Sequence, residues 1–197
     1  KLNTIGMYYE NPLLTYQINI KKLYPKQFVL TKLNLNNQAK LFVCMSTYMK
    51  INITFIETMY KIMQLQQEYN KNTYLIINLY AIEKTKHKLK VYVKTIENIF
   101  VDKTILEKVV FLNNKPSITK TKLFYYSLLK HSDCILEPFP FGGLNSTYDA
   151  LSVNKPIITY PAKFLSGRFT LGLYSYIQFY NTIANNIHEY IELSIQY

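Results

Sequence analysis

Apolar residues along this chain follow two kinds of pattern from residue 41 onward. Short continuous apolar runs, typical of strands buried on both faces of a sheet, occur at residues 41–45, 74–79, 109–112, 134–136 and 156–160. Other segments repeat their apolar side chains at helical spacing, as in the set Phe55, Ile56, Met59, Ile62 and Met63. This spacing predicts helices at residues 54–66, 89–100, 122–130, 145–153, 169–179 and 188–196.

The alternation of strands and helices with short connections predicts the fold class. It is typical of an α/β fold, here a Rossmann-like parallel sheet with helices on both faces. Ligands of such sheets bind beyond the carboxyl ends of the strands. The turns at residues 45–50 and 138–147 both follow predicted strands, so we expect both turns at that edge.

Residues 1–40 have a different character. They are rich in Asn, Pro and Tyr, and no helical pattern repeats convincingly among them. We interpret residues 1–40 as a linker and the tail of a preceding domain, and residues 41–197 as one α/β domain. The chain starts with Lys1 and ends inside a helical pattern, which suggests a segment of a longer protein.

The net charge of +11 changes this picture little. Arg168 is the single arginine among 23 basic Lys and Arg residues, and the chain is rich in Lys, Asn, Ile and Tyr, which share A/T-rich codons. Base readers and phosphate clamps usually favour arginine. We therefore interpret the charge as a solvated surface and expect no nucleic-acid partner, leaving a basic nucleic-acid binder as the weakest alternative.

The cysteines and the apolar runs bear on compartment and on metal binding. Cys44 and Cys134 lie in strand patterns without the spacing of a zinc site, so we expect buried thiols, a reducing cytoplasmic location and no metal. No signal peptide is visible, and the strongly apolar run at residues 74–82 is too short to span a bilayer. We expect no membrane partner.

The stretch at residues 132–151 predicts a phosphate site. An apolar strand runs into a turn that contains Gly142 and Gly143, which permit backbone shapes and close approaches that a side chain would block. Three small polar residues, Asn145, Ser146 and Thr147, then open a helix whose dipole favours an anion. The same three residues would also serve as an ordinary helix cap.

Three runs of the sequence occur in the order expected for motifs of a known family. The run LEPFPFGGLNSTYDAL at residues 136–151 resembles the LDPFPFGGGNTTYEAL loop of glycosyltransferase family 41, the O-linked N-acetylglucosamine transferases and their bacterial tetratricopeptide relatives. The run FVCMSTYMKI at 42–51 resembles its YLCPQSLFKL strand and turn, and PAKFLSGRFTLGL at 161–173 resembles PGEFLRGRFTLAL. The match spans roughly residues 40–197.

The resemblance implies the C-terminal, donor-binding half of a GT-B glycosyltransferase that uses a UDP-sugar without a metal. Lys50 falls on the family lysine that contacts the diphosphate, where its ammonium would neutralise the leaving UDP. The resemblance further implies that the nucleotide-sugar site comprises Thr47, Lys50, Lys122, Tyr125, Asn145, Ser146, Thr147 and Asp149, with Asp149 near the ribose. It also implies a protein acceptor, an N-terminal catalytic half and tetratricopeptide repeats in the full-length parent.

Three departures from the family pattern keep alternatives open. Leu144 stands where the family has Gly or His, Glu137 replaces Asp, and Ser46 replaces a common Gln. We expect an inverting protein O-glycosyltransferase acting on Ser or Thr, with this segment alone inactive. The alternatives are an N-glucosyltransferase that uses UDP-glucose on Asn, and a non-catalytic scaffold whose nucleotide site has decayed.

Overall fold

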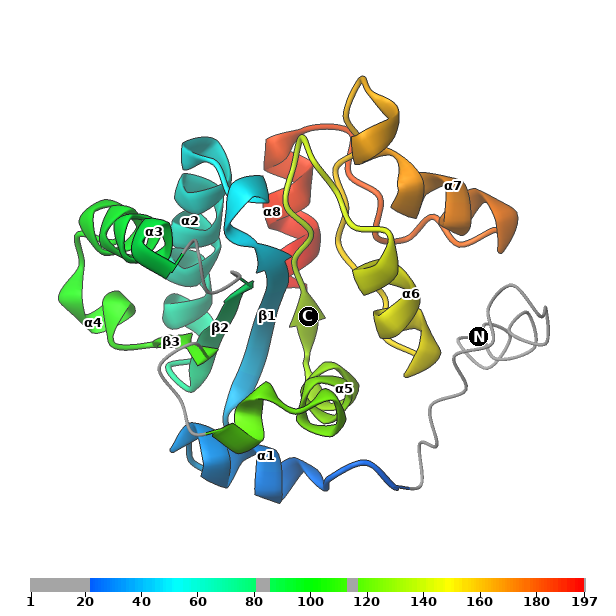
Figure 1. Ribbon diagram of the computed structural model, residues 1–197. Coiled ribbons are helices and arrows are strands. Elements are labelled where there is room, and N and C mark those ends of the chain that lie inside the picture. Colours follow the sequence, from blue (N-terminus) through cyan, green and yellow to red (C-terminus); the bar gives the residue numbers. More distant parts are fainter. Residues whose placement is uncertain (1–21, 81–85, 113–116, 197) are drawn as a thin grey trace.

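A four-stranded parallel sheet lies at the centre of the molecule (Figure 1). The structure is a computed structural model that describes residues 22–80, 86–112 and 117–196. The strand order is β3-β2-β1-β4, and the strands are β1 (Lys40–Thr47), β2 (Thr73–Tyr80), β3 (Val109–Phe111) and β4 (Cys134–Ile135). All three strand pairings are parallel. The predicted α/β class with a parallel sheet is confirmed.

Helices connect and flank these strands. The α-helices are α1 (Lys26–Leu33), α2 (Ile53–Tyr69), α3 (Lys86–Ile99), α4 (Lys103–Leu106), α5 (Lys122–His131), α6 (Asn145–Ser152), α7 (Phe169–Tyr176) and α8 (Ile187–Ile195). The 3₁₀ turns η4 (Tyr48–Lys50), η7 (Ser117–Lys120) and η8 (Leu165–Gly167) lie between these elements.

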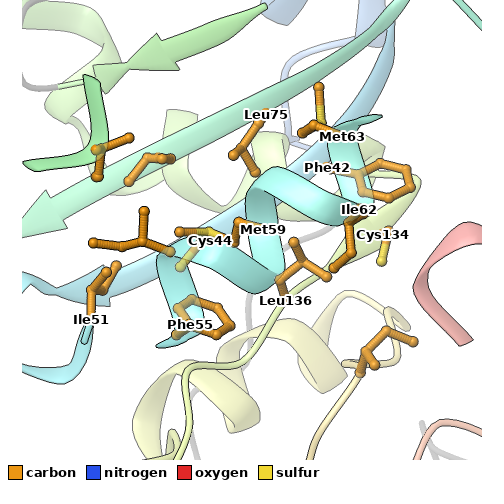
Figure 2. Close-up of a cluster of buried hydrophobic side chains, with 14 of the residues drawn as sticks. Phe42, Cys44, Ile51, Phe55, Met59, Ile62, Met63, Leu75, Cys134 and Leu136 are labelled. Atoms are coloured by element: carbon orange, nitrogen blue, oxygen red, sulfur yellow. The ribbon is translucent and has the colours of Figure 1, made fainter. Parts of the chain in front are cut away.

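The side chains of β1 alternate between two hydrophobic cores, one on each face of the sheet. Phe42 and Cys44 pack with α2 in the first core (Figure 2). Tyr190 of α8 also belongs to this core. Leu41 and Val43 point the other way and pack with α1, α5 and α6. Because successive side chains of a strand face opposite sides, one apolar run can serve both cores. Burial also raises the pKa of the Cys44 thiol to about 12, which keeps it uncharged.

A helix forms where the sequence analysis expected none. Helix α1 lies within the region interpreted as a linker, yet Val29, Leu30 and Leu33 are fully buried against the face that carries α5. The helix starts after Pro25 and ends at Leu33, and the following residue, Asn34, has a left-handed φ of 61°. Its eight residues are too few for a helical repeat to stand out, although a proline before and an asparagine after are ordinary boundary signals.

The predicted strand at residues 156–160 is reduced to two isolated parallel bridges. Leu136 pairs with Ile158, and Thr159 pairs with Ile183, so the parallel order continues beyond β4 only at single positions. The Tyr174 hydroxyl accepts from the Ile157 N–H at 2.6 Å and donates to its carbonyl at 3.0 Å. A side chain thus satisfies backbone groups that a neighbouring strand would otherwise pair. Helix α7 ends at Tyr176, three residues before the predicted end at residue 179.

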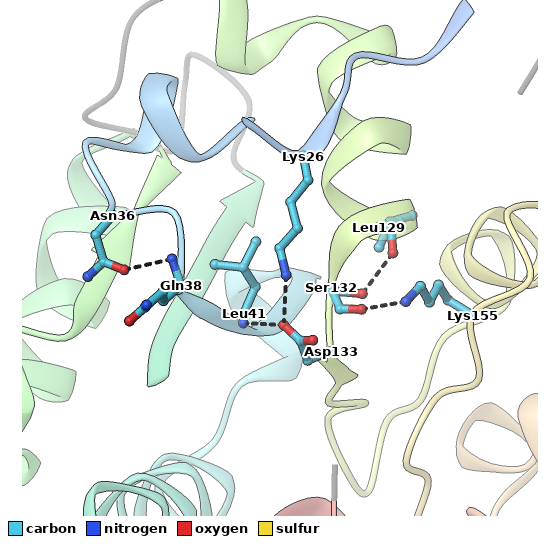
Figure 3. Close-up of polar contacts among 8 residues, drawn as sticks. All are labelled: Lys26, Asn36, Gln38, Leu41, Leu129, Ser132, Asp133 and Lys155. Atoms are coloured by element: carbon cyan, nitrogen blue, oxygen red, sulfur yellow. Dashed lines mark hydrogen bonds and ion pairs between the residues drawn. The ribbon is translucent and has the colours of Figure 1, made fainter. Parts of the chain in front are cut away.

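Polar contacts lock β4 beside β1 at the amino edge of the sheet (Figure 3). The Asp133 N–H donates to the Leu41 carbonyl, and the Leu41 N–H donates to the Asp133 carboxylate, both at 2.8 Å. Lys26 of α1 lies 3.9 Å from the same carboxylate. The Lys155 ammonium donates to the Ser132 carbonyl at the end of α5, at 2.7 Å. These contacts anchor the edge opposite to the predicted phosphate site.

Candidate nucleotide-binding site

A recess lies between the carboxyl ends of β1 and β4. Strands β2 and β3 lie on one side of β1, and β4 lies on its other side. The strand order therefore reverses between β1 and β4. The lining of the recess includes Met45, Ser46, Glu137, Gly143 and Ser146. In open α/β sheets such a reversal is where ligands bind.

The two predicted turns meet at this edge and are tied together. The Lys50 ammonium, at the end of η4, donates to the Gly142 carbonyl at 2.6 Å and lies 4.5 Å from the centre of the Phe141 ring. The Asn52 side-chain amide donates to the Phe139 carbonyl at 2.5 Å. Burial lowers the pKa of Lys50, and the charge of Glu137 opposes that shift. The expectation that both turns share one edge is confirmed.

Gly143 allows close packing where α6 begins. Neither Gly142 nor Gly143 has a positive φ, so a left-handed backbone is not what requires them. A Cβ at Gly143 would lie 2.4 Å from the Ser146 hydroxyl oxygen and 3.1 Å from Oε1 of Glu137. The glycine therefore serves close approach, one of the two uses that the sequence suggested.

The first turn of α6 leaves backbone N–H groups available. The N–H groups of Thr147 and Tyr148 donate to the Leu144 carbonyl. Within residues 117–196, the structure pairs no acceptor with the N–H groups of Leu144, Asn145 and Ser146. Asn145 is exposed and Ser146 lines the recess. A helix start with free N–H groups carries partial positive charge and suits an anion such as a phosphate.

The two threonines of the predicted site differ in placement. Thr47 ends β1 and is half-buried at the recess edge of the sheet. Thr147 is fully buried, and its hydroxyl shares a 2.8 Å hydrogen bond with Thr170 and lies 3.4 Å from Oε1 of Glu137. The Thr147 side chain therefore faces the interior, so any part it takes in binding would come through its position in the helix.

Asp149 bridges α6 to α5. Its two carboxylate oxygens accept from the Tyr125 hydroxyl at 3.0 Å and the Tyr126 hydroxyl at 2.6 Å. Burial, together with the charge of Asp149 and its hydrogen bonds, raises the pKa of both tyrosines. Lys122 is exposed at the first residue of α5. The structure thus brings Tyr125 and Asp149 together, and adds Tyr126, which the sequence analysis did not single out.

Glu137 is the main polar residue of this region that the sequence analysis missed, because it treated the residue only as a departure from a pattern. Its side chain is 6% exposed and lines the recess floor. Burial raises the pKa of Glu137, and its hydrogen bonds with Thr159, Thr170, Gly143 and Thr147 oppose the shift. A charged residue inside an apolar run, followed by several threonines, is the signal that could have revealed it.

Two findings bear on metals and membranes. Among residues 22–80, 86–112 and 117–196, His, Cys, Asp and Glu do not gather in groups of three or more that could hold a metal ion. Within the same ranges, no helix has the length and apolarity that crossing a membrane would take.

Comparison with solved structures places the fold among the GT-B glycosyltransferases. An O-GlcNAc transferase from Thermobaculum terrenum has a TM-score of 0.63 and 18% identity, with 80% of this chain and 28% of that chain covered. A UDP-forming α,α-trehalose-phosphate synthase from Burkholderia vietnamiensis has a TM-score of 0.54 and 9% identity, covering 98% and 41%. The trehalose-6-phosphate protein of E. coli bound with UDP-2-fluoro glucose has a TM-score of 0.51 and 14% identity, covering 98% and 41%.

These similarities establish the fold and not a family. No protein-family model and no curated protein matches the sequence. The chain spans between 28% and 41% of the lengths of these three solved chains. The site residues inferred from the family resemblance therefore stay predictions, now with a defined geometry.

Proposed function

We propose that this chain is the UDP-sugar-binding part of a glycosyltransferase. The observation that carries the proposal is the recess between β1 and β4, whose lining includes Gly143 and Ser146 at the start of α6. Among the described residues, the N–H of Ser146 has no acceptor, and the Lys50 ammonium is bonded to the carbonyl of Gly142, the neighbour of Gly143. Helix N-termini and lysines both stabilise phosphate oxygens. The same recess occupies the ligand position of open α/β sheets.

The proposed chemistry is inverting transfer. The acceptor oxygen forms a bond to the anomeric carbon of the sugar while the bond from that carbon to the diphosphate breaks, and the electron pair goes to the diphosphate. Lys50 and the N–H groups of Asn145 and Ser146 stabilise the charge that develops there. No metal is required in this scheme. In this scheme the acceptor hydroxyl gives its proton to a base of the catalytic N-terminal half.

We place the nucleoside beside α5 and the start of α6, near Lys122, Tyr125 and Asp149. Tyr125 and Asp149 are held against each other, so they would form one wall of the site rather than two independent contacts. Thr47 lies at the strand end, close to where the diphosphate would sit.

The acceptor and the cellular setting are proposed from the family resemblance. We propose a protein acceptor modified on Ser or Thr, within a longer cytoplasmic parent that carries a catalytic N-terminal half and tetratricopeptide repeats. The free, buried thiols of Cys44 and Cys134 suit a reducing compartment. Mapping the modified residues of acceptor proteins by mass spectrometry separates this activity from glucosylation of Asn.

A second candidate, a scaffold without nucleotide affinity, is favoured by one set of contacts. The side chains of Lys50, Thr147 and Asp149 are all engaged inside the protein, with the Gly142 carbonyl, with Thr170 and with two tyrosines respectively. A site that had lost its ligand could keep such contacts for stability alone. This candidate predicts that neither UDP nor a UDP-sugar binds.

Calorimetric titration of the chain with UDP, and with GDP for comparison, tests the proposal. Lys50→Met should weaken UDP binding by about 1.5–3 kcal/mol, as expected for a charge-assisted contact. Lys94→Met is the matched control, because the Lys94 side chain is 71% exposed on α3. UDP binding that is unaffected by Lys50→Met would contradict the assigned role of Lys50. No binding of either nucleotide, in this chain or in its full-length parent, would favour the scaffold.

A further inference from the structure

Glu137 lies directly beneath the loop that enters α6. It follows β4 by two residues, and its backbone is held on both sides. Its N–H donates to the Ile158 carbonyl at 3.1 Å, and its carbonyl accepts from the buried Tyr190 hydroxyl at 3.0 Å. The side chain therefore projects from a fixed point into the floor of the recess.

The Glu137 carboxylate collects donors from separate parts of the chain. Oε1 accepts from the Gly143 N–H at 2.7 Å and from the Thr170 hydroxyl of α7 at 2.5 Å, with the Thr147 hydroxyl of α6 at 3.4 Å. Oε2 accepts from the Thr159 hydroxyl at 2.5 Å. A buried charge is tolerated only where hydrogen bonds replace its lost water. The Gly143 N–H and the hydroxyls of Thr159 and Thr170 supply such bonds, although burial still leaves the pKa of Glu137 raised.

These bonds decide which groups of the loop face the recess. The Gly143 N–H and the Thr147 hydroxyl face inward to the carboxylate, while the N–H groups of Leu144, Asn145 and Ser146 have no acceptor among the described residues. The tight fit also explains Gly142, since a Cβ there would lie 3.1 Å from Cδ of Glu137. The carboxylate thus fixes the conformation of the turn that is proposed to bind the anion.

We infer that Glu137 is a positioning residue for the diphosphate of the nucleotide: it orients the N–H groups at the start of α6 by holding Gly143 and Thr147. The inference rests on the proposed function. An amide cannot replace the carboxylate in this role, because a glutamine has one acceptor oxygen and an NH₂ group that would face a donor. An aspartate keeps the charge but is one methylene shorter, so it cannot reach both Gly143 and Thr159 from the same backbone position.

The test measures the UDP affinity and the thermal stability of E137Q and E137D side by side. Each variant should raise the Kd of UDP by about tenfold or more, as expected when a hydrogen-bonded charge is lost or displaced. Gln66→Leu is the matched control. Gln66 is also buried, at 1% exposure, and is held by hydrogen bonds to Ile195 and Thr73 in the core around α2 and α8. It should lower the melting temperature but leave the Kd of UDP unchanged within about twofold, because distant sites contribute independently.

A second readout follows the loop itself. Amide hydrogen exchange of Gly143 should be faster in E137Q than in wild type, while exchange at Val43 in the centre of β1 should be unchanged. If E137Q does not fold, the Kd of UDP and the exchange rate of the Gly143 amide in E137D test the inference.

The outcomes separate the inference from the proposed function. If the wild type binds UDP and the folded Glu137 variants bind it with the same Kd, the positioning role alone is overturned. An unchanged exchange rate of the Gly143 amide overturns it as well. Wild-type protein that binds no UDP, alone or within its full-length parent, overturns the proposed function and this inference with it.

Discussion

Replacement of Gly167 by alanine should separate two loops that meet beside the recess. A Cβ at this position would lie 2.1 Å from the Pro140 carbonyl oxygen and 2.6 Å from the Ala162 Cβ. Carbon atoms need about 3.5–4.0 Å between non-bonded neighbours, so a backbone must move by about 1 Å or more. Both obstacles are close to the main chain, and rotation of a flexible side chain cannot relieve them.

The cost can be worked from these contacts. Overpacking of this kind costs about 1–3 kcal/mol. The same movement strains two main-chain hydrogen bonds, Ala162 N–H to the Gly167 carbonyl at 3.1 Å and Gly142 N–H to the Ser166 carbonyl at 3.0 Å. Each such bond is worth about 0.5–1.5 kcal/mol. We therefore expect Gly167→Ala to lower the free energy of unfolding by about 2–6 kcal/mol.

Urea unfolding followed by circular dichroism measures this change, and Gly172→Ala is the matched control. Gly172 lies within α7, and a Cβ there would meet nothing within 4 Å. Alanine is favoured over glycine inside a helix by about 1 kcal/mol, so Gly172→Ala should keep or raise the stability. A Gly167→Ala protein within about 0.5 kcal/mol of wild type, the range of ordinary surface substitutions, would refute the reasoning.

Three further predictions concern polar contacts. Burial lowers the pKa of His131 below its usual 6.5. Nearby lysines add to this shift, and a hydrogen bond with the backbone of Tyr24 opposes it. The unfolded chain then binds the proton first, so stability should fall as the pH drops from neutral through that lowered pKa. The fall should be smaller in His131→Asn, as urea midpoints across this range would show. Tyr126→Phe should cost about 1–3 kcal/mol in urea unfolding because it removes a donor to the charged Asp149, and an unchanged midpoint would contradict the assigned contact. Asn52→Ala should cost about 1–2 kcal/mol, and more than Asn186→Ala, since both cap helices but Asn52 also holds the loop after β4. Equal losses in the two variants would argue against that loop contact.

The local sequence pattern was sufficient for most of the fold. The runs near residues 41–45, 74–79 and 109–112 became β1, β2 and β3, because buried parallel strands need continuous apolar side chains on both faces. The same reasoning missed helix α1, and it predicted a strand at residues 156–160 that the structure reduces to isolated bridges. The first is too short to repeat its pattern, and the second takes part of its backbone pairing from the Tyr174 side chain.

The sequence by itself determined the order of the elements and the edge at which the two motif-bearing turns would lie, because strand direction and chain order follow from local periodicity and short connections. Only the tertiary structure decided which polar groups face the recess. The donors to Glu137 lie six to 33 residues further along the chain, and the Asp149 carboxylate meets tyrosines more than 20 residues before it. Hydrogen-bond partners are chosen by proximity in three dimensions, where burial makes an unpaired polar group costly. That choice turned Thr147 and the Gly143 N–H inward and, within the part of the chain that the structure describes, left the N–H groups of Asn145 and Ser146 without acceptors.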